Sequence, residues 1–380
     1  KPRILVLGVG GAGGNAINGM IESGLQGVEF IAVNTDAQDL KHSQATQKIQ
    51  IGLNLTKGLG TGAKIDIGQA AADESLNDIV NTLQGANMVF ITAGMGGGTG
   101  TGAAPAIAKI SRETNALTIG IVTKPFAFEG PIRKKRALEG IKEMKKNCDT
   151  LLVIPNEILL EIASDNTTVT DSFKLADSVL NQATKGISDL INKPGLINLD
   201  YADVKTIMKN MGDAIMGTGI AHGEEKAILA AQQAINSPLL QNTSIKGAKG
   251  LLVNVSGSQE MTMRELNSAS SIIYEEAGED ANVILGCVID PDLTDEIRIT
   301  VIATGLNDAD YPDFYDTDSE IDFREKYNSH SITIEEEPNW LEKTNKKNKL
   351  DNFSEEDDNK ESESNSKQSD LDIPTFLRNN

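Results

Sequence analysis

Several residue types that build common kinds of site are scarce in this chain of 380 residues. Its only two cysteines, Cys148 and Cys287, lie far apart and lack the spacing of metal ligands. Its three histidines form no H-x-x-x-H pair. These counts disfavour a disulfide-stapled fold and a zinc site, and they are typical of proteins from a reducing cytosol. We therefore expect a cytoplasmic protein.

Long apolar runs and positive charge are lacking as well. No run approaches the ~18 residues of a membrane-spanning helix, so we expect no direct membrane insertion. The formal net charge is −20, and a chain this acidic is repelled by nucleic acid and by anionic membrane surfaces. We expect neither as a direct partner. The chain begins at Lys1 rather than at Met, so we also expect a segment before it.

Short apolar runs alternate with helical patterns through the first half of the chain. The runs are typical of buried parallel strands, and the alternation predicts an α/β domain with a parallel sheet. Strands are expected at 4–7, 28–33, 88–92, 117–122 and 150–154, and helices at 15–23 and 103–110.

The second half of the chain has a different pattern. From 169 to 191 apolar residues recur with helical spacing, which predicts one long helix joining two domains. Beyond it, the patterns predict an α+β domain. The expected domains are 1–168, the connecting helix 169–195, and 196–306. In the last of these, helices are expected at 201–211, 224–235 and 263–276, and strands at 251–255, 282–289 and 297–303.

The composition changes sharply beyond residue 306. Residues 307–380 contain 21 acidic and 9 basic side chains, a net charge of −12. A polar, low-complexity segment cannot bury enough apolar surface to offset its ordering entropy, so we predict a disordered acidic linker over 307–370. Residues 371–380 turn apolar again at Ile373, Phe376 and Leu377. This end is either a frayed terminus or a peptide that folds in a partner's groove.

A first glycine cluster follows the first expected strand. Residues 8–15, GVGGAGGN, contain the G-x-G-x-x-G pattern in which backbone N–H groups and a helix N-terminus approach phosphate oxygens. Alone, the pattern is a weak signal, because a tight strand–helix turn also produces it and a dinucleotide-dependent oxidoreductase is a serious alternative. For the oxidoreductase, Asp36 after the second strand would be the ribose-binding acid.

A second glycine cluster is more informative. Residues 94–102, GMGGGTGTG, again follow an expected strand and precede an Ala-rich helix. Two such loops at neighbouring strand ends would converge on one polyphosphate, and an oxidoreductase leaves the second loop unexplained. No Walker A sequence, G-x-x-x-x-G-K-[ST], occurs in the chain. Phosphate charge would then be offset by N–H groups, helix ends and a metal ion.

This second loop resembles a known family closely. Residues 96–102, GGGTGTG, match the tubulin/FtsZ signature G-G-G-T-G-[ST]-G without departure. Further matches are Asn34-Thr35-Asp36, TKPF at 123–126, and FEG at 128–130 with Arg133. The resemblance is to the bacterial cell-division members of the family, and it covers 2–305 with a second patch at 372–378.

The resemblance implies a site for GTP or GDP. Phe173 would stack on guanine, and Asp177 would accept hydrogen bonds from its ring N–H and amino group. Glu129 and Arg133 would contact the ribose or a nearby phosphate. From the sequence alone, Phe173 would be a core residue and the other two a surface ion pair. The phosphates would be held by Gly11, Ala12, Gly13, Gly14, Asn15, Gly97, Gly98, Thr99, Gly100 and Thr101. Mg²⁺ would lie on the phosphates with no assigned protein ligand, and a monovalent cation is a further candidate.

An acidic pair opens the helix expected at 201. Asp200 and Asp203 stand at i and i+3, hence on one face, and the pattern alone predicts an N-cap with an acidic first turn. The resemblance implies catalysis as well. Together with Asn198, the pair would complete the active site of a neighbouring subunit and orient the attacking water. The two interpretations are compatible, because a capping acid can also face a neighbour.

The resemblance finally implies a function for the whole chain. It would be a GTPase that assembles head to tail into filaments of the bacterial division ring at midcell, since heterologous contacts that do not close generate filaments. Residues 371–378 would bind a membrane adaptor and division regulators. Two alternatives stay open: the oxidoreductase, and a scaffold that binds GTP without hydrolysing it. The presence of Asp200 and Asp203 argues against the scaffold.

Overall fold

The computed structural model of the chain describes residues 1–306, apart from positions 164–165, 194, 198, 241–243 and 292. All the described residues belong to one compact unit. The expected linker 307–370 and terminal peptide 371–380 lie outside the described residues, as does Asn198.

An 11-stranded mixed sheet runs through the described part of the chain, in the order β3-β2-β1-β4-β5-β6-β8-β11-β9-β10-β7. The first six strands in this order are parallel: β3 (Gln47–Gln50), β2 (Glu29–Asn34), β1 (Ile4–Val9), β4 (Met88–Gly94), β5 (Leu117–Lys124) and β6 (Thr150–Pro155). The others mix both directions: β8 (Gly212–His222), β11 (Glu296–Thr304), β9 (Gly250–Gly257), β10 (Asn282–Ile289) and β7 (Gly195–Ile197). A short parallel pairing of β6 with β8 joins the two sets.

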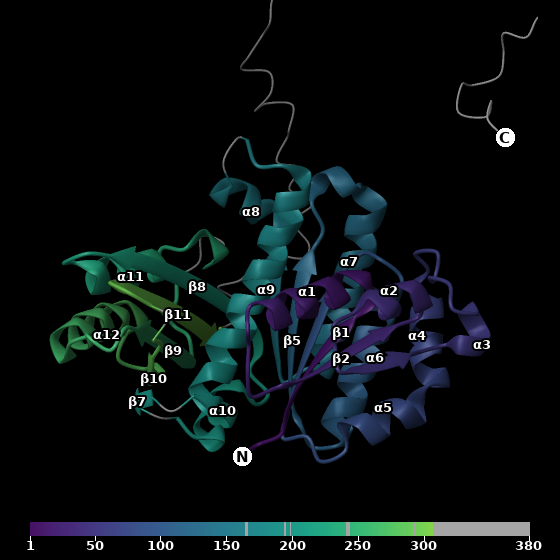
Figure 1. The fold of residues 1–380 in the computed structure, drawn as a ribbon, viewed down its shortest axis with the longest axis horizontal. Helices are drawn as coiled ribbons and strands as arrows, with labels where there is room; N and C mark the ends of the chain where they lie inside the picture. Colours follow the sequence, from purple (N-terminus) through teal and green to yellow (C-terminus); the bar gives the residue numbers. More distant parts are fainter. Residues whose placement is uncertain (164–165, 194, 198, 241–243, 292, 307–380) are drawn as a thin grey trace, which may run out of the picture. The chain divides into compact units, whose positions relative to one another are not determined.

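Helices cover both faces of the sheet (Figure 1). On one face α1 (Gly10–Glu22) and α9 (Val169–Asn192) pack over the parallel strands. On the other, α4 (Ile65–Glu74), α5 (Leu76–Leu83), α6 (Thr99–Glu113) and α7 (Pro131–Asn147) cover the first half, and α11 (Lys226–Ile235) and α12 (Met263–Ala277) cover the second. The remaining helices are α2 (Ala37–His42), α3 (Leu53–Thr56), α8 (Asn156–Ile162) and α10 (Tyr201–Met208).

The long helix predicted at 169–191 is present as α9. Thr168 caps it by accepting a hydrogen bond from the Asp171 backbone N–H. Its apolar face packs on α1 and β5, and further along on β9, β10 and β11. At ~1.5 Å per residue a helix of 24 residues spans about 36 Å, so α9 reaches from the first set of strands to the second. None of the helices in the described ranges is long and apolar enough to cross a membrane.

The structure differs from the expected elements in two ways that involve glycine: two helices start earlier than expected, and one strand was missed. The helices expected at 15 and 103 begin earlier, at Gly10 and Thr99, because the glycine loops themselves form the first helical turns. Strand β8 was not expected at all, since its sequence GDAIMGTGIAH has no alternating apolar pattern. Its glycines allow close packing instead, because a Cβ on Gly217 or Gly219 would collide with backbone carbonyls of α11.

Candidate functional site

The two glycine loops meet at one edge of the sheet. They follow the neighbouring parallel strands β1 and β4, whose ends are in register at Val9 and Ala93. Gly10 has a φ of +73°, and a Cβ placed on it would lie 2.9 Å from the backbone nitrogen of Gly100. The loops therefore touch backbone to backbone, and only glycine fits at the point of contact.

Threonine hydroxyls hold this arrangement together. The buried hydroxyls of Thr35, which follows β2, and Thr99 lie 2.9 Å apart. The hydroxyl of Thr101 accepts a hydrogen bond of 2.8 Å from the Gly96 N–H and so fixes the second loop internally. The loops that follow three neighbouring strands of the sheet, β2, β1 and β4, thus converge.

Both helices that start in the loops present unpaired backbone donors. The N-cap residues of α1 and α6, Val9 and Gly98, supply no capping side chain, and neither first turn contains an acid. The first N–H groups of a helix have no partner within the helix, and with the helix dipole they attract anions. A Cβ on Gly14 or Gly97 would meet nothing within 4 Å, so the backbone there borders open space. The loops form a surface suited to an anion.

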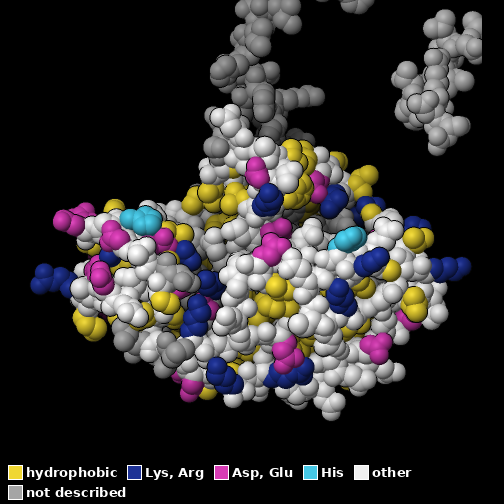
Figure 2. Space-filling model, viewed as in Figure 1, with side chains coloured by type: hydrophobic (Ala, Val, Ile, Leu, Met, Phe, Trp, Pro, Cys, Tyr) yellow, Lys and Arg dark blue, Asp and Glu magenta, His cyan; other side chains and the backbone are white. Residues whose placement is uncertain are grey.

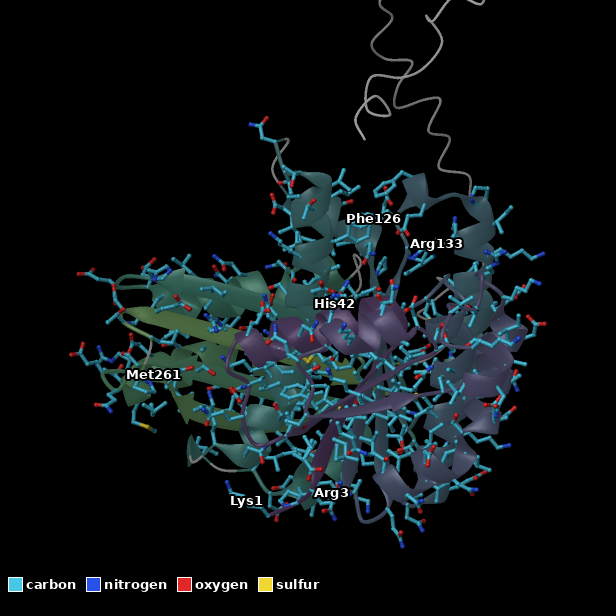
Figure 3. All side chains as sticks on the ribbon, turned by 45° about the vertical axis from the view of Figure 1, so that its right-hand side comes forward. Lys1, Arg3, His42, Phe126, Arg133 and Met261 are labelled. Atoms are coloured by element: carbon cyan, nitrogen blue, oxygen red, sulfur yellow. The ribbon has the colours of Figure 1, made fainter. Side chains whose placement is uncertain are left out.

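Glu129 and Arg133 lie beside the second loop and form an ion pair of 2.9 Å. The Glu129 side chain is only 11% exposed, and its Oε1 accepts a hydrogen bond from the Phe126 N–H. A Cβ on Gly96 would lie 2.7 Å from Cγ of Arg133, so the half-exposed guanidinium lies close to the loop backbone. Figure 3 shows Arg133 and Phe126 at the same side of the sheet. This largely buried carboxylate sets the pair apart from ordinary surface ion pairs.

Phe173 and Asp177 lie one turn apart on α9. Phe173 is 41% exposed, which a core residue would not be, and it packs edge-on against Phe126 at a ring-centroid distance of 5.4 Å. Burial raises the pKa of the Asp177 carboxyl to about 6. No side chain or backbone donor among the described residues pairs with this carboxylate. An exposed aromatic face and an unpaired acid thus stand side by side.

The structure adds information on two further side chains, Asn156 and Asp36. Asn156, the first residue of α8 after β6, is buried, and its Oδ1 has no partner among the described residues. The sequence reasoning missed it, although a polar residue at the end of a parallel strand is a weak signal. Asp36 caps α2 by accepting at Oδ1 from the backbone N–H groups of Gln38 and Asp39.

Asp200 and Asp203 form a reciprocal cap at the start of α10. Asp200 Oδ1 accepts from the Asp203 N–H at 2.9 Å, and Asp203 Oδ2 accepts from the Asp200 N–H at 3.1 Å. Both side chains are exposed. Tyr201, the residue after Asp200, donates a hydrogen bond of 2.7 Å to the carbonyl of Asn87, which directly precedes β4. The pair therefore lies at the amino end of β4, whereas the glycine loops lie at its carboxyl end.

That separation is large. Strand β4 has seven residues, and at ~3.3 Å per residue it spans about 20 Å. Within one chain, the acidic pair cannot reach a ligand held by the glycine loops.

Comparison with known proteins agrees with this geometry. Residues 3–164 match the GTPase domain of the Tubulin/FtsZ family, and residues 212–307 match the C-terminal domain of the FtsZ family. A cell division protein FtsZ from Wolbachia sp is 52% identical over 318 residues, which cover 80% of this chain and 80% of the relative. The chain belongs to the tubulin/FtsZ family. The resemblance that rested on residues 96–102 is thereby confirmed.

Two other FtsZ proteins show the extent of the match. A cell division protein FtsZ from Caulobacter vibrioides is 53% identical over 309 residues, and the chain spans 61% of the length of that relative. A solved structure described as an FtsZ dimer, empty, from M. jannaschii superposes with a TM-score of 0.77 at 45% identity, covering 80% of this chain and 88% of that one.

The described residues contain no group of three or more His, Cys, Asp or Glu side chains that could hold a metal ion.

Proposed function

We propose that this chain binds GTP and hydrolyses it only where two copies meet head to tail, and that the resulting filaments serve bacterial cell division. The observation that carries the proposal is the placement of the glycine loops and of Asp200 and Asp203 at opposite ends of β4. Contacts of this heterologous kind build open filaments when the rotation between subunits does not close.

The residues at the loop edge suit a guanine nucleotide. The backbone N–H groups of the two loops would hold the phosphates, with Arg133 beside them. Phe173 offers a ring face to the base. The Asp177 carboxylate would accept from both the ring N–H and the amino group of guanine, whereas adenine presents only one donor and an acceptor at the corresponding edge. A half-buried carboxylate without a protein donor is destabilising, and a guanine would supply the missing donors.

The acidic pair is suited to orienting water. Each capping hydrogen bond uses one carboxylate oxygen, so Oδ2 of Asp200 and Oδ1 of Asp203 remain free to accept from a water molecule. Presented to the phosphate of the neighbouring copy, these oxygens would position the nucleophile for in-line attack. Mg²⁺, bound on the phosphates, would offset their charge. Asn198 would assist from the preceding loop.

Apolar side chains are exposed at the loop edge. Figure 2 shows them gathered over α8 and the adjoining part of α9. The exposed large residues of α8 and α9 are Leu160, Ile162, Val169 and Phe173. Contiguous exposed apolar surface usually marks an interface, so this edge is suited to receive the amino-end edge of the next copy. Residues 371–378 would in turn bind a membrane adaptor at the division site.

Phosphate release measured against protein concentration tests the proposal. With Mg²⁺ and saturating GTP, we expect turnover per molecule to rise from near zero above a threshold concentration, because the site forms only on assembly. Asp203→Asn should bind GTP normally and lose at least tenfold in turnover, while Asp280→Asn, an exposed acid of the α12–β10 connection, serves as the matched control. Turnover per molecule that is independent of concentration, or an unaffected Asp203→Asn chain, would overturn the proposal.

A further inference from the structure

A charged cluster lies at the carboxyl-terminal end of α9, where Asp189, Lys193 and Asp290 meet. Lys193 Nζ lies 3.1 Å from Asp189 Oδ2 and 3.7 Å from Asp290 Oδ2. The carboxylates are only 3% and 12% exposed, and the lysine side chain is 34% exposed. Burial raises the pKa of Asp189, while the adjacent Lys193 opposes that shift. One ammonium thus bridges two largely buried carboxylates.

This cluster is a poor source of stability. Removing charges from water often costs as much as their attraction returns, and apolar residues of similar size would serve the fold as well. In addition, Asp189 Oδ1 is buried and has no hydrogen-bond partner among the described residues. The cluster instead fixes the geometry of the chain, since an ion pair with defined geometry holds two chain segments in one relative position.

The segments it holds are the end of α9 and the end of β10. Lys193 is the C-cap of α9, and its backbone N–H donates to the Asp189 carbonyl at 2.9 Å. Asp290 directly follows β10, and its N–H donates to the Gly257 carbonyl at the end of β9, also at 2.9 Å. The Lys193 bridge therefore ties the helix to the carboxyl end of two neighbouring strands.

The chain that leaves this bridge leads straight to the acidic pair. Beyond Lys193, β7 pairs with β10, with Ile197 opposite Cys287. Leu199 packs against the core, and a Cβ on Gly286 would lie 3.4 Å from its Cδ1. Asp200 then caps α10. Among the described residues of this stretch, Lys193 thus stands at its start, β7 pairs with β10, and Asp200 at its end caps α10.

We propose that Lys193 is a positioning residue for hydrolysis: by joining Asp189 to Asp290 it fixes the connection that presents Asp200 and Asp203 to the neighbouring copy. The inference rests on the proposed role of that acidic pair. Lys193 itself neither contacts nucleotide nor transfers a proton. Its loss would leave GTP binding and the glycine loops intact, while the two carboxylates would present the wrong geometry to the water.

The test uses the full chain and compares Lys193→Met, Lys193→Arg and, as the matched surface control, Lys146→Met, which breaks an exposed pair with Glu143. We expect Lys193→Met to lower kcat per assembled subunit at least tenfold, with GTP affinity, KM and the sedimented fraction within twofold of wild type. Lys193→Arg should retain at least half of the wild-type kcat, because it keeps the charge that bridges the two carboxylates. Lys146→Met should be unchanged.

A second variant, Asp290→Asn, decides the case if Lys193→Met fails to fold. It keeps the Asp189–Lys193 pair but weakens the link to β10, and it should lower kcat three- to tenfold at unchanged KM. Wild-type kcat in both variants, or a parallel loss of GTP affinity, assembly and kcat, would overturn the inference. Asp203→Asn, measured alongside, separates the two claims: if it keeps full turnover, the proposed function fails and the role of Lys193 falls with it, whereas lost turnover in Asp203→Asn with wild-type kcat in Lys193→Met and Asp290→Asn overturns the role of Lys193 alone.

Discussion

At the residue scale, Asp177 carries a cost to the stability of the fold that the proposed contact with guanine would offset. Its carboxyl has a pKa of about 6 in the folded chain, above the ordinary value of 3.8, because burial disfavours the charged form. The folded state therefore holds this proton more tightly than the unfolded state does. Stability is highest below the unfolded pKa and falls as the pH rises from about 4 through 6.

This sign gives a stability prediction for the nucleotide-free chain. At pH 7.5, Asp177→Asn should raise the free energy of unfolding by about 1–3 kcal/mol, since it removes a half-buried charge that has no hydrogen-bond donor among the described residues. At pH 4 the gain should largely disappear, because the wild-type carboxyl is then protonated in the fold. Denaturant unfolding at the two pH values measures both differences, and a gain that does not change with pH would contradict the explanation.

The same substitution should weaken guanine binding. We expect Asp177→Asn to lose at least tenfold in GTP affinity, about 1.4 kcal/mol, because an amide cannot accept from both guanine donors as a carboxylate does. Calorimetry at pH 7.5 measures the loss, with Asp171→Asn, an exposed acid of the same helix, as the control. Equal affinities for GTP in wild type and Asp177→Asn would remove Asp177 from the site.

At the element scale, the glycine loops depend on backbone contact rather than on side chains. Gly10→Ala should abolish GTP binding and destabilise the chain by about 2 kcal/mol or more, because its φ is +73° and the new Cβ would press on Gly100. Gly19→Ala in the same helix has open space around it and should stabilise the chain by up to about 1 kcal/mol. Thermal unfolding and GTP titration of the two variants check this contrast. Normal GTP binding by Gly10→Ala would contradict it.

Elements could be predicted from the sequence where local patterns determine them, and not where tertiary contacts do. The apolar runs of β1, β4 and β5 and the long periodic face of α9 depend on local patterns, and the structure confirms them. Strand β8 could not be predicted, because its two central glycines fit against α11 only in the folded chain. Asn156 was missed for the same reason, since its unpartnered oxygen is a property of burial and not of sequence.

At the scale of the whole molecule, the arrangement of the two halves of the site matters most. Motifs predicted the convergence of the two loops. Only tertiary contacts, such as the hydrogen bond from Tyr201 to Asn87, place α10 at the opposite edge of the sheet. Under the proposed function, a single copy would hold two incomplete half-sites, and a second copy would complete each of them.

Mixing two inactive variants tests this claim most directly. Gly10→Ala should lack the nucleotide half-site but keep Asp203, and Asp203→Asn should keep the nucleotide half-site but lack the acid. Each alone should release phosphate at less than a tenth of the wild-type rate. We predict that an equimolar mixture recovers up to about a quarter of that rate, and more than the sum of its parts, because random mixing brings an Asp203→Asn subunit with bound GTP against the intact acidic edge of a Gly10→Ala subunit at about one contact in four. A mixture no more active than the sum of its parts would contradict hydrolysis between subunits.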